Sequence, residues 1–262
     1  MNRKQSKTNV TQITYITQET RKELVRLAAE YETKRFLNGD PSSFMHQVQG
    51  KENQEVTAFV ASCLSYGNRS QFLPKIRWIV NCAKGDVYGW VWSGLFTDVI
   101  NAESDECFYR LYSFRQMNAF LCRLRQMLQE YGSMGQYVRK HSNGDAFSAV
   151  VAICRWFANS GTGHIVPKNT QSSCKRICLF LRWMVRSGSP VDLGIWADFI
   201  SRRSLIMPLD THVLQQSIRL GLLKSKTATM NTAKRLTNKL CEIFPDDPLK
   251  GDFALFGYGV NN

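Results

Sequence analysis

Apolar residues recur every three or four positions along almost the whole chain, whereas the strict alternation typical of strands is nearly absent. From about 18 to 36, Leu24, Leu27, Ala28 and Tyr31 form such a helical stripe, with Thr20 as a candidate cap. The same spacing predicts helices over 54–67, from about 70 onward, and over 95–102, 114–131, 133–140, 145–158, 172–187, 192–200, 211–220, 227–243 and 248–256. We therefore expect an all-α fold of roughly ten short helices.

With 262 residues, 44% hydrophobic content and 7 prolines, the chain can bury one large core or two small ones. The apolar stretches "ICLFLRWMVR" and "FALFGYGV" are too short to span a bilayer, and the amino terminus "MNRKQSKTNVTQITYI" lacks the apolar segment of a secretory signal. We expect a cytoplasmic protein without a membrane partner.

The cysteines are scattered along the chain, so reduced thiols are expected. Cys174 and Cys178 are close in sequence, but they supply two of the four ligands that zinc or an iron–sulfur cluster usually takes. We predict no metal and no cofactor.

The charge balance is strongly basic. Lys and Arg number 34 and Asp and Glu 21, which gives a net charge of +13. The basic residues are spread along the chain, so a folded basic surface is expected, and its partner would be a polyanion such as nucleic acid.

The stretch "IMPLDTHVLQQSIRLGLL" (206–223) places Asp210 and His212 at the mouth of a helix. Pro208 favours an extended approach, Asp210 is a good N-cap, and Gly221 is a typical stop. As a cap, Asp210 is fully explained, and His212 reads as an ordinary surface histidine.

The same stretch resembles the "PVDTHVxRVxxRLGL" motif of the helix-hairpin-helix DNA glycosylases, in which the Asp is the catalytic carboxylate. Two further stretches resemble that family in the same order, namely "EVTAFVASCLSYGNRSQFLPKI" (55–76) and "GDFALFGYGV" (251–260). As a whole, the chain looks most like an uncharacterised bacterial family of hypothetical proteins distantly related to those enzymes. The cysteine cluster that follows in many relatives is absent.

The typical "LPGVGxxTA" hairpin is missing, because that window reads "SPVDLGIWADFI" here. Archaeal 8-oxoguanine DNA glycosylases have a similar layout, with a degenerate hairpin and a catalytic Lys in a "KTxVFxxKM" context. The corresponding residue in this chain is Lys175, at the start of "KRICLFLRWMVR" and 35 residues before Asp210. Ser172 or Ser173 would cap that helix.

The resemblance implies two helical subdomains flanking a cleft, one built from 1–54 and 201–262 and the other from 55–200, although a single compact unit is also compatible with the sequence. It implies a monomer that binds duplex DNA, flips a damaged base such as 8-oxoguanine into a pocket and cleaves its N-glycosidic bond. Lys175 would be the nucleophile and Asp210 the carboxylate that relays its proton and stabilises the sugar cation. The Schiff base so formed would also permit strand cleavage.

Several residues are expected to contact DNA. Asn68 and Arg69 would fill the vacated base stack, and His212 would meet a phosphate at a helix N-terminus. His164, in the loop "NSGTGHIVPKNTQ", would touch a base or phosphate. At 100° per residue, Lys175, Arg182 and Arg186 share the face opposite the apolar one and would form a basic stripe along the phosphate backbone. Arg176, next to Lys175, is also expected to bind DNA.

Two other interpretations are compatible with the sequence. The chain could be a non-catalytic nucleic-acid-binding protein on a glycosylase scaffold, or a helical protein-interaction module whose charge is incidental.

Overall fold

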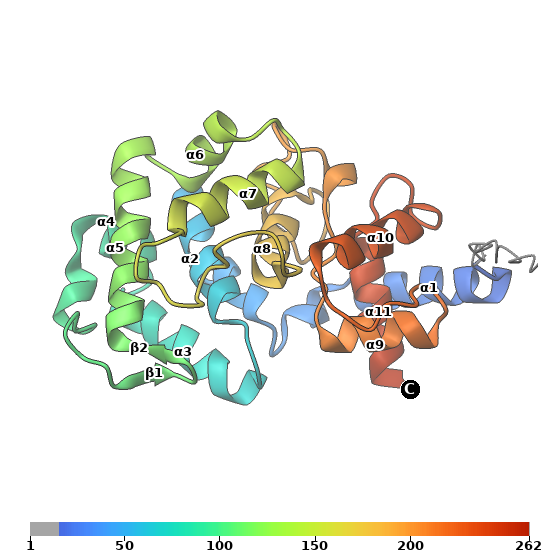
Figure 1. The fold of residues 1–262 in the computed structure, drawn as a ribbon, viewed down its shortest axis with the longest axis horizontal. Helices are drawn as coiled ribbons and strands as arrows, with labels where there is room; N and C mark the ends of the chain where they lie inside the picture. The colour runs from blue at the N-terminus through green and yellow to red at the C-terminus, as the bar shows by residue number, and fades with distance from the viewer. Residues whose placement is uncertain (1–15, 262) are drawn as a thin grey trace, which may run out of the picture.

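The structure of the protein, a computed structural model, describes residues 16–261 and is mostly helical (Figure 1). The first part of the chain forms α1 (Gln18–Tyr31), 3₁₀-helices η1 (Lys34–Leu37) and η2 (Pro41–His46), α2 (Lys51–Leu64), α3 (Arg69–Cys82), α4 (Val87–Ser93), η3 (Leu95–Asp98) and a two-stranded hairpin, β1 (Cys107–Tyr109) and β2 (Tyr112–Ser113). There follow α5 (Phe114–Tyr131), α6 (Met134–His141), α7 (Ala146–Phe157), α8 (Lys175–Val185), η4 (Arg202–Ser204), α9 (Thr211–Arg219), α10 (Met230–Cys241) and α11 (Lys250–Asn261).

The helical class predicted from periodicity is confirmed, and α5 has the predicted bounds. Its start is fixed by a capping box, in which Ser113 accepts the N–H of Gln116 and the Gln116 side chain accepts the N–H of Ser113. Residues 1–15 lie outside the described residues. Two expectations concern them, namely that they carry no secretory signal and that they belong to the terminal subdomain.

One local prediction is wrong, and two elements were missed. Segment 192–200 forms turns instead of a helix, because it folds back onto the end of α8, where Leu193 and Gly194 both donate to the Trp183 carbonyl. Helix α4 was missed, and so was the β1–β2 hairpin, whose strands are too short to show an alternating pattern.

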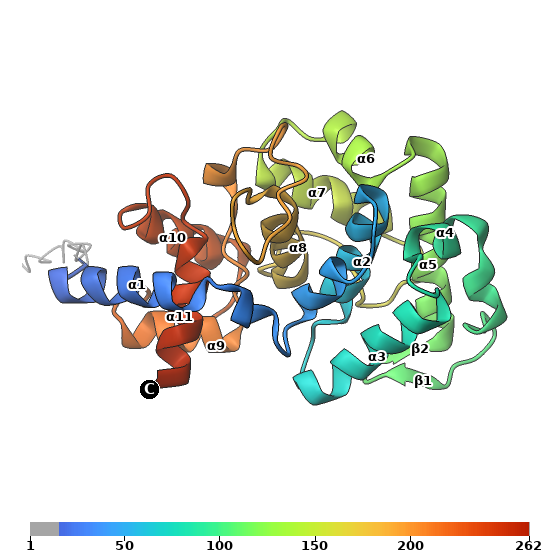
Figure 2. The same cartoon turned by 180° about the vertical axis from the view of Figure 1, so that it is seen from behind.

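The helices are arranged around α2 and α8. Figures 1 and 2 show α1, α9, α10 and α11 together at one end of the molecule, and α4, α5 and the hairpin at the other. Helices α1 and α11, from opposite ends of the chain, pack directly on each other. One continuous hydrophobic cluster runs through both groups. The two-subdomain division stays a prediction, and η2, which we assigned to the terminal subdomain, packs against α2 and α3.

Across residues 16–261, no helix is both long enough and apolar enough to cross a membrane.

Candidate functional site

The segment that precedes α9 brings Asp210 beside the start of α8. Met207 is held by the hydroxyl of Thr237, which accepts its N–H at 2.9 Å, and the carbonyl of Leu209 accepts the hydroxyl of Ser173 at 2.7 Å. Asp210 then caps α9, its Oδ1 accepting the N–H of Val213 at 2.8 Å. The predicted capping role is confirmed.

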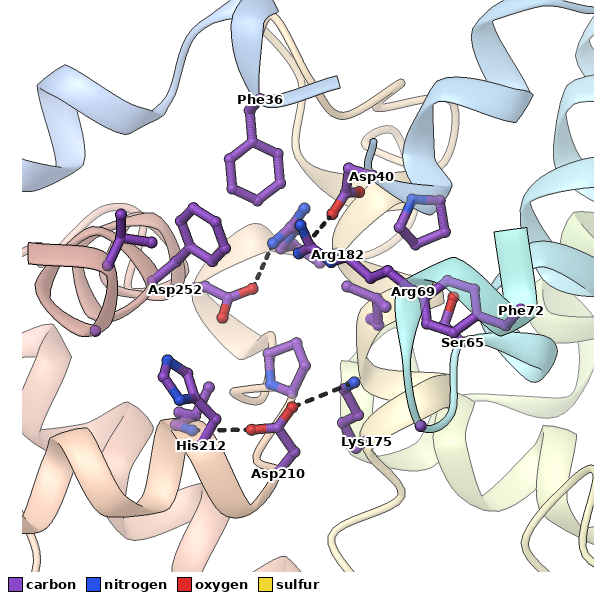
Figure 3. Close-up of a pocket in the computed structure, with 18 residues that line it drawn as sticks. Phe36, Asp40, Ser65, Arg69, Phe72, Lys175, Arg182, Asp210, His212 and Asp252 are labelled. Carbon is purple, nitrogen blue, oxygen red and sulfur yellow. Dashed lines mark hydrogen bonds and ion pairs between the residues drawn. The ribbon is translucent and has the colours of Figure 1, made fainter. Parts of the chain in front are cut away.

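Lys175 is the first residue of α8. The residue before it, Cys174, adopts a left-handed conformation with φ 48° and makes no side-chain cap, so the expectation that Ser172 or Ser173 caps this helix is wrong. Ser173 is instead engaged by the Leu209 carbonyl. The turn at Cys174 starts α8 beside the 206–210 segment, and Nζ of Lys175 lies 3.3 Å from Oδ2 of Asp210 (Figure 3).

This ion pair stands at a cavity of about 430 Å³. The cavity takes its walls from α3, α8, α9, α11 and the segments around η1 and η2, and its lining includes Phe36, Asp40, Ser65, Arg69, Phe72, Lys175, Arg182, Asp210, His212, Asp252 and Phe256. A second cavity of about 500 Å³ shares Lys175, Asp210 and His212 with it. The Lys175 and Asp210 side chains are 32% and 36% exposed, so both remain accessible from the cavities.

Arg182 does not belong to an exposed basic stripe, contrary to our expectation. The residue is 2% exposed, its Nε lies 3.2 Å from Oδ1 of Asp192, and its Nη1 pairs with Oδ2 of Asp252. It therefore cannot follow a phosphate backbone. The physical reason is that α8 packs against both α2 and α7 and is buried on almost all sides, so its polar face also lies inside the protein.

Arg186 is likewise buried, at 1% exposure. Its Nε and Nη2 bind the Asp247 carboxylate, Nη1 pairs with Asp192, and Nη2 lies 2.7 Å from Oε1 of Glu32. The network joins α8 to the loops that precede α9 and α11 and to the end of α1. Because these charges are paired and hydrogen-bonded, their burial is tolerated.

The surroundings shift the pKa values of two acidic groups that contact these arginines. Burial raises the pKa of Asp192, although Arg182 and Arg186 beside it act in the opposite direction. Burial also raises the pKa of Asp252, against the effect of Arg182, and the nearby Asp210 carboxylate adds to the rise. Asp252 therefore has a reduced tendency to ionise in the cavity wall.

The other expected DNA contacts divide into two groups. Arg69 and His212 line the cavity, Arg69 reaching across from α3 to lie 3.3 Å from Asp40 (Figure 3). Asn68 caps α3 by accepting the N–H of Ser70, and His164 is exposed but lines neither cavity.

Arg176 is half-buried and lines the second cavity, and its guanidinium also bonds to the protein. Its guanidinium donates to the carbonyls of Cys63, at 3.1 Å, and His164, at 2.6 Å, and to the hydroxyl of Tyr112. It therefore fastens the 158–171 loop to α2 and β2. The catalytic roles of Lys175 and Asp210 stay predictions, and so do the DNA contacts expected of the residues other than Arg182 and Arg186.

The thiols near Lys175 are not arranged as a metal site. Within the described part of the chain, no three His, Cys, Asp or Glu side chains are placed to hold an ion together. Burial raises the pKa of Cys63 to about 12 and also raises the pKa of Cys178, which disfavours the thiolate that binds metals.

Sequence reasoning missed several cavity residues. Asp40 lies within the turn-rich stretch "NGDPSSF" (38–44) and Phe36 precedes that stretch, with nothing in the local pattern to set either residue apart. Asp252 and Phe256 lie in the "GDFALFGYGV" stretch that we did single out, so the resemblance located their helix without indicating which side chains face the cavity.

No curated protein and no solved structure matches this chain. Residues 40–261, which include every element of the site from Asp40 to α11, match the family described as "Protein of unknown function (DUF2400)". That span is most of the chain, and the chain therefore belongs to the DUF2400 family.

Proposed function

We propose that this protein is a DNA glycosylase with an associated lyase activity, acting on a base extruded from the duplex. The observation that carries the proposal is the Lys175–Asp210 pair, with Nζ and Oδ2 3.3 Å apart and both side chains accessible at the mouth of a cavity. The pair combines a nucleophilic amine with a carboxylate that can exchange a proton with it.

The chemistry would proceed at C1′ of the extruded nucleotide. Asp210 accepts a proton from the Lys175 ammonium, and the amine lone pair forms a bond to C1′ as the C1′–N bond breaks with its electrons passing to the base. The proton held by Asp210 then becomes available to the departing base. The second amine proton then passes to O4′ as the C1′–O4′ bond breaks and the nitrogen lone pair forms the C1′=N bond of a protonated Schiff base, which β-elimination or hydrolysis resolves.

The cavity suits a flipped base in size and in composition. Its volume of about 430 Å³ lies in the range of small-ligand sites, and Phe36, Phe72 and Phe256 supply apolar wall. The N-terminal turn of α9 lies beside it, with Thr211 and His212 exposed, so its backbone N–H groups can meet a phosphate. The net charge of +13 supports a polyanionic substrate.

Borohydride trapping tests the proposal. Duplexes carrying an abasic site, 8-oxoguanine, uracil, hypoxanthine or an alkylated base are incubated with the protein and reduced, and the covalent complex is separated by denaturing electrophoresis. We expect the wild type to trap the abasic duplex. Lys175→Gln should abolish trapping, and Asp210→Asn should slow it at least about tenfold.

Lys168→Gln provides the matched control, because this exposed lysine is close in sequence and lines neither of the two cavities. It should trap as the wild type does. If the wild type binds DNA in a salt-dependent manner but traps and excises nothing, the enzyme proposal is wrong and the protein is a nucleic-acid binder. Binding without salt dependence would contradict both.

A further inference from the structure

The segment that runs from α9 through α10 is strongly basic. Residues 211–241 contain no Asp or Glu and six basic residues, namely Arg219, Lys224, Lys226, Lys234, Arg235 and Lys239. Within residues 16–261, the segment makes one ion pair, between Lys239 and Glu242 just beyond its end. Exposed arginines elsewhere pair with carboxylates, as Arg139 on α6 does with Asp198. The charge of 211–241 is therefore left largely uncompensated by the protein itself.

Three of these cations are exposed and have no ionic partner. Arg235 shares the outer face of α10 with Asn231 and Asn238, opposite the residues that this helix buries in the core. Lys224 and Lys226 lie in the turn between α9 and α10, and both are exposed. In the described part of the chain, none of the three cations lies within ion-pair distance of a carboxylate. We call Lys224, Lys226 and Arg235 the α10 basic surface.

Hydrogen bonds hold the turn that carries the two lysines. Oγ of Ser225, which lies between them, is 3.3 Å from Oγ1 of Thr227 and 3.4 Å from Oγ1 of Thr232 on α10. Thr229 caps α10 by accepting the N–H of Thr232 at 3.2 Å. The lysines are thus presented from an ordered turn, and less conformational entropy is lost when they bind a partner.

The α10 basic surface borders the second cavity. Thr229 forms an isolated antiparallel bridge with Ser172, three residues before Lys175, so α10 begins beside the start of α8 (Figure 1). Ala228 lines the second cavity together with Lys175. Arg235 follows Thr229 by six residues, which is about 9 Å along the helix. A strand that places one nucleotide at Lys175 would therefore have its neighbouring phosphates within reach of this surface.

Resting on the proposed function for the identity of the polyanion as DNA, we propose that Lys224, Lys226 and Arg235 bind phosphates of the strand that carries the extruded nucleotide. Exposed cations without carboxylate partners match a phosphate backbone in charge, and each phosphate that they neutralise releases counterions. Contacts with phosphates do not depend on base sequence. The α10 basic surface therefore positions the strand, while the choice of base stays with the cavities.

Fluorescence anisotropy tests the proposal with a labelled duplex that carries one tetrahydrofuran abasic analogue, which cannot form a Schiff base. Lys224→Gln, Lys226→Gln and Arg235→Gln are combined in one variant. We expect this variant to bind at least about tenfold more weakly than the wild type at about 0.15 M salt. The slope of log Kd against log salt concentration should fall by about 2–3, because each lost phosphate contact removes about 0.9. An undamaged duplex should show the same change in slope.

The matched control combines Lys22→Gln, Lys51→Gln and Lys84→Gln. These lysines are also exposed, but each is followed within two residues by an Asp or Glu. The control removes the same total charge, and its affinity for the duplex should stay within about twofold of the wild type. Urea unfolding of both triple variants shows that each is folded.

Equal losses of affinity in the two triple variants would overturn the proposal, because total charge and not this surface would then account for binding. Unchanged affinity of the first variant would overturn it as well. Borohydride trapping by the wild type is scored separately. A protein that binds DNA through the α10 basic surface but traps nothing would support the inference and contradict the proposed glycosylase chemistry, whereas a wild type that binds no DNA would contradict both.

Discussion

Nζ of Lys175 lies 3.3 Å from Oδ2 of Asp210, while Oδ1 of the same carboxylate accepts the N–H of Val213 at 2.8 Å. One oxygen therefore holds α9 and the other faces the amine. Because the cap fixes the carboxylate, the position of Oδ2 relative to Lys175 does not depend on the ion pair itself.

Mutation can separate the capping role of Asp210 from its ion pair with Lys175. An asparagine can still cap the helix through its amide oxygen, whereas an alanine cannot. We expect Asp210→Ala to lower the free energy of unfolding by about 1 kcal/mol and Asp210→Asn by less than about 0.5 kcal/mol. Urea denaturation followed by circular dichroism measures both. Equal losses for the two variants would show that the cap contributes nothing.

The buried charges on α8 predict that substitution of Asp192 strongly lowers the free energy of unfolding. Its carboxylate is fully buried between Arg182 and Arg186, so Asp192→Ala leaves two buried cations undercompensated and should cost about 3–5 kcal/mol. The exposed pair of Arg115 with Asp105, whose side chains are 50% and 76% exposed, provides the comparison. There Asp105→Ala should cost less than about 1 kcal/mol. Similar losses in urea unfolding at the two sites would contradict this account.

Glu55 predicts a pH dependence of stability. Its carboxylate accepts N–H donors from Met134, Gly135 and Trp196, but burial outweighs these bonds and raises its pKa from 4.5 to about 7. The folded protein thus keeps a proton that the unfolded chain loses, so the free energy of unfolding should fall as pH rises from about 4.5 to about 7. Above that range the contribution is constant.

Glu55→Gln removes this titration, so its free energy of unfolding should fall less steeply than that of the wild type across the same pH range. Glu106→Gln, at an exposed position just before β1, serves as the control and should keep the wild-type slope. Urea titrations at several pH values give the slopes, and a Glu55→Gln slope equal to that of the wild type would refute the assignment.

Two glycines of α11 are expected to respond differently to alanine. A Cβ at Gly257 would lie 2.4 Å from Cδ2 of Tyr31, inside the packed contact between α1 and α11, and should cost about 1–3 kcal/mol. A Cβ at Gly259 would lie 2.3 Å from Nε2 of His212, the end of an exposed side chain that can turn away. Thermal unfolding should show a lower midpoint for Gly257→Ala than for Gly259→Ala.

The sequence predicted those features that depend on neighbouring residues. The cap at Asp210 and the bounds of α5 follow from local chemistry, namely a side-chain acceptor placed before a helical stripe. The closeness of Lys175 and Asp210 could be anticipated only through the resemblance, because periodicity does not say which helix starts meet.

Burial on all sides of a helix is a property of the assembled fold. The spacing of Arg182 and Arg186 is that of a solvated face, and their acidic partners Glu32, Asp192 and Asp247 are dispersed along the chain. The same limit applies to Glu55, whose donors come from α6 and from the turns after α8. Besides the nearby Asp192, each arginine has a partner distant in sequence, as Glu55 does, and local patterns do not reveal such partners.

The pairing of α1 with α11 has a consequence for the order of events during synthesis. Tyr31 and Asn261, which bond across this contact at 2.9 Å, are 230 positions apart. On the ribosome, the apolar stripe of α1 is made first but stays without its partner until translation has reached α11. Phe256 belongs to the same late helix, so the wall around Lys175 closes last, and contacts of such long range are typical of slow folding. A nascent chain of this protein would therefore carry Lys175 in an unfinished cavity from the time that residue is made until α11 has been added.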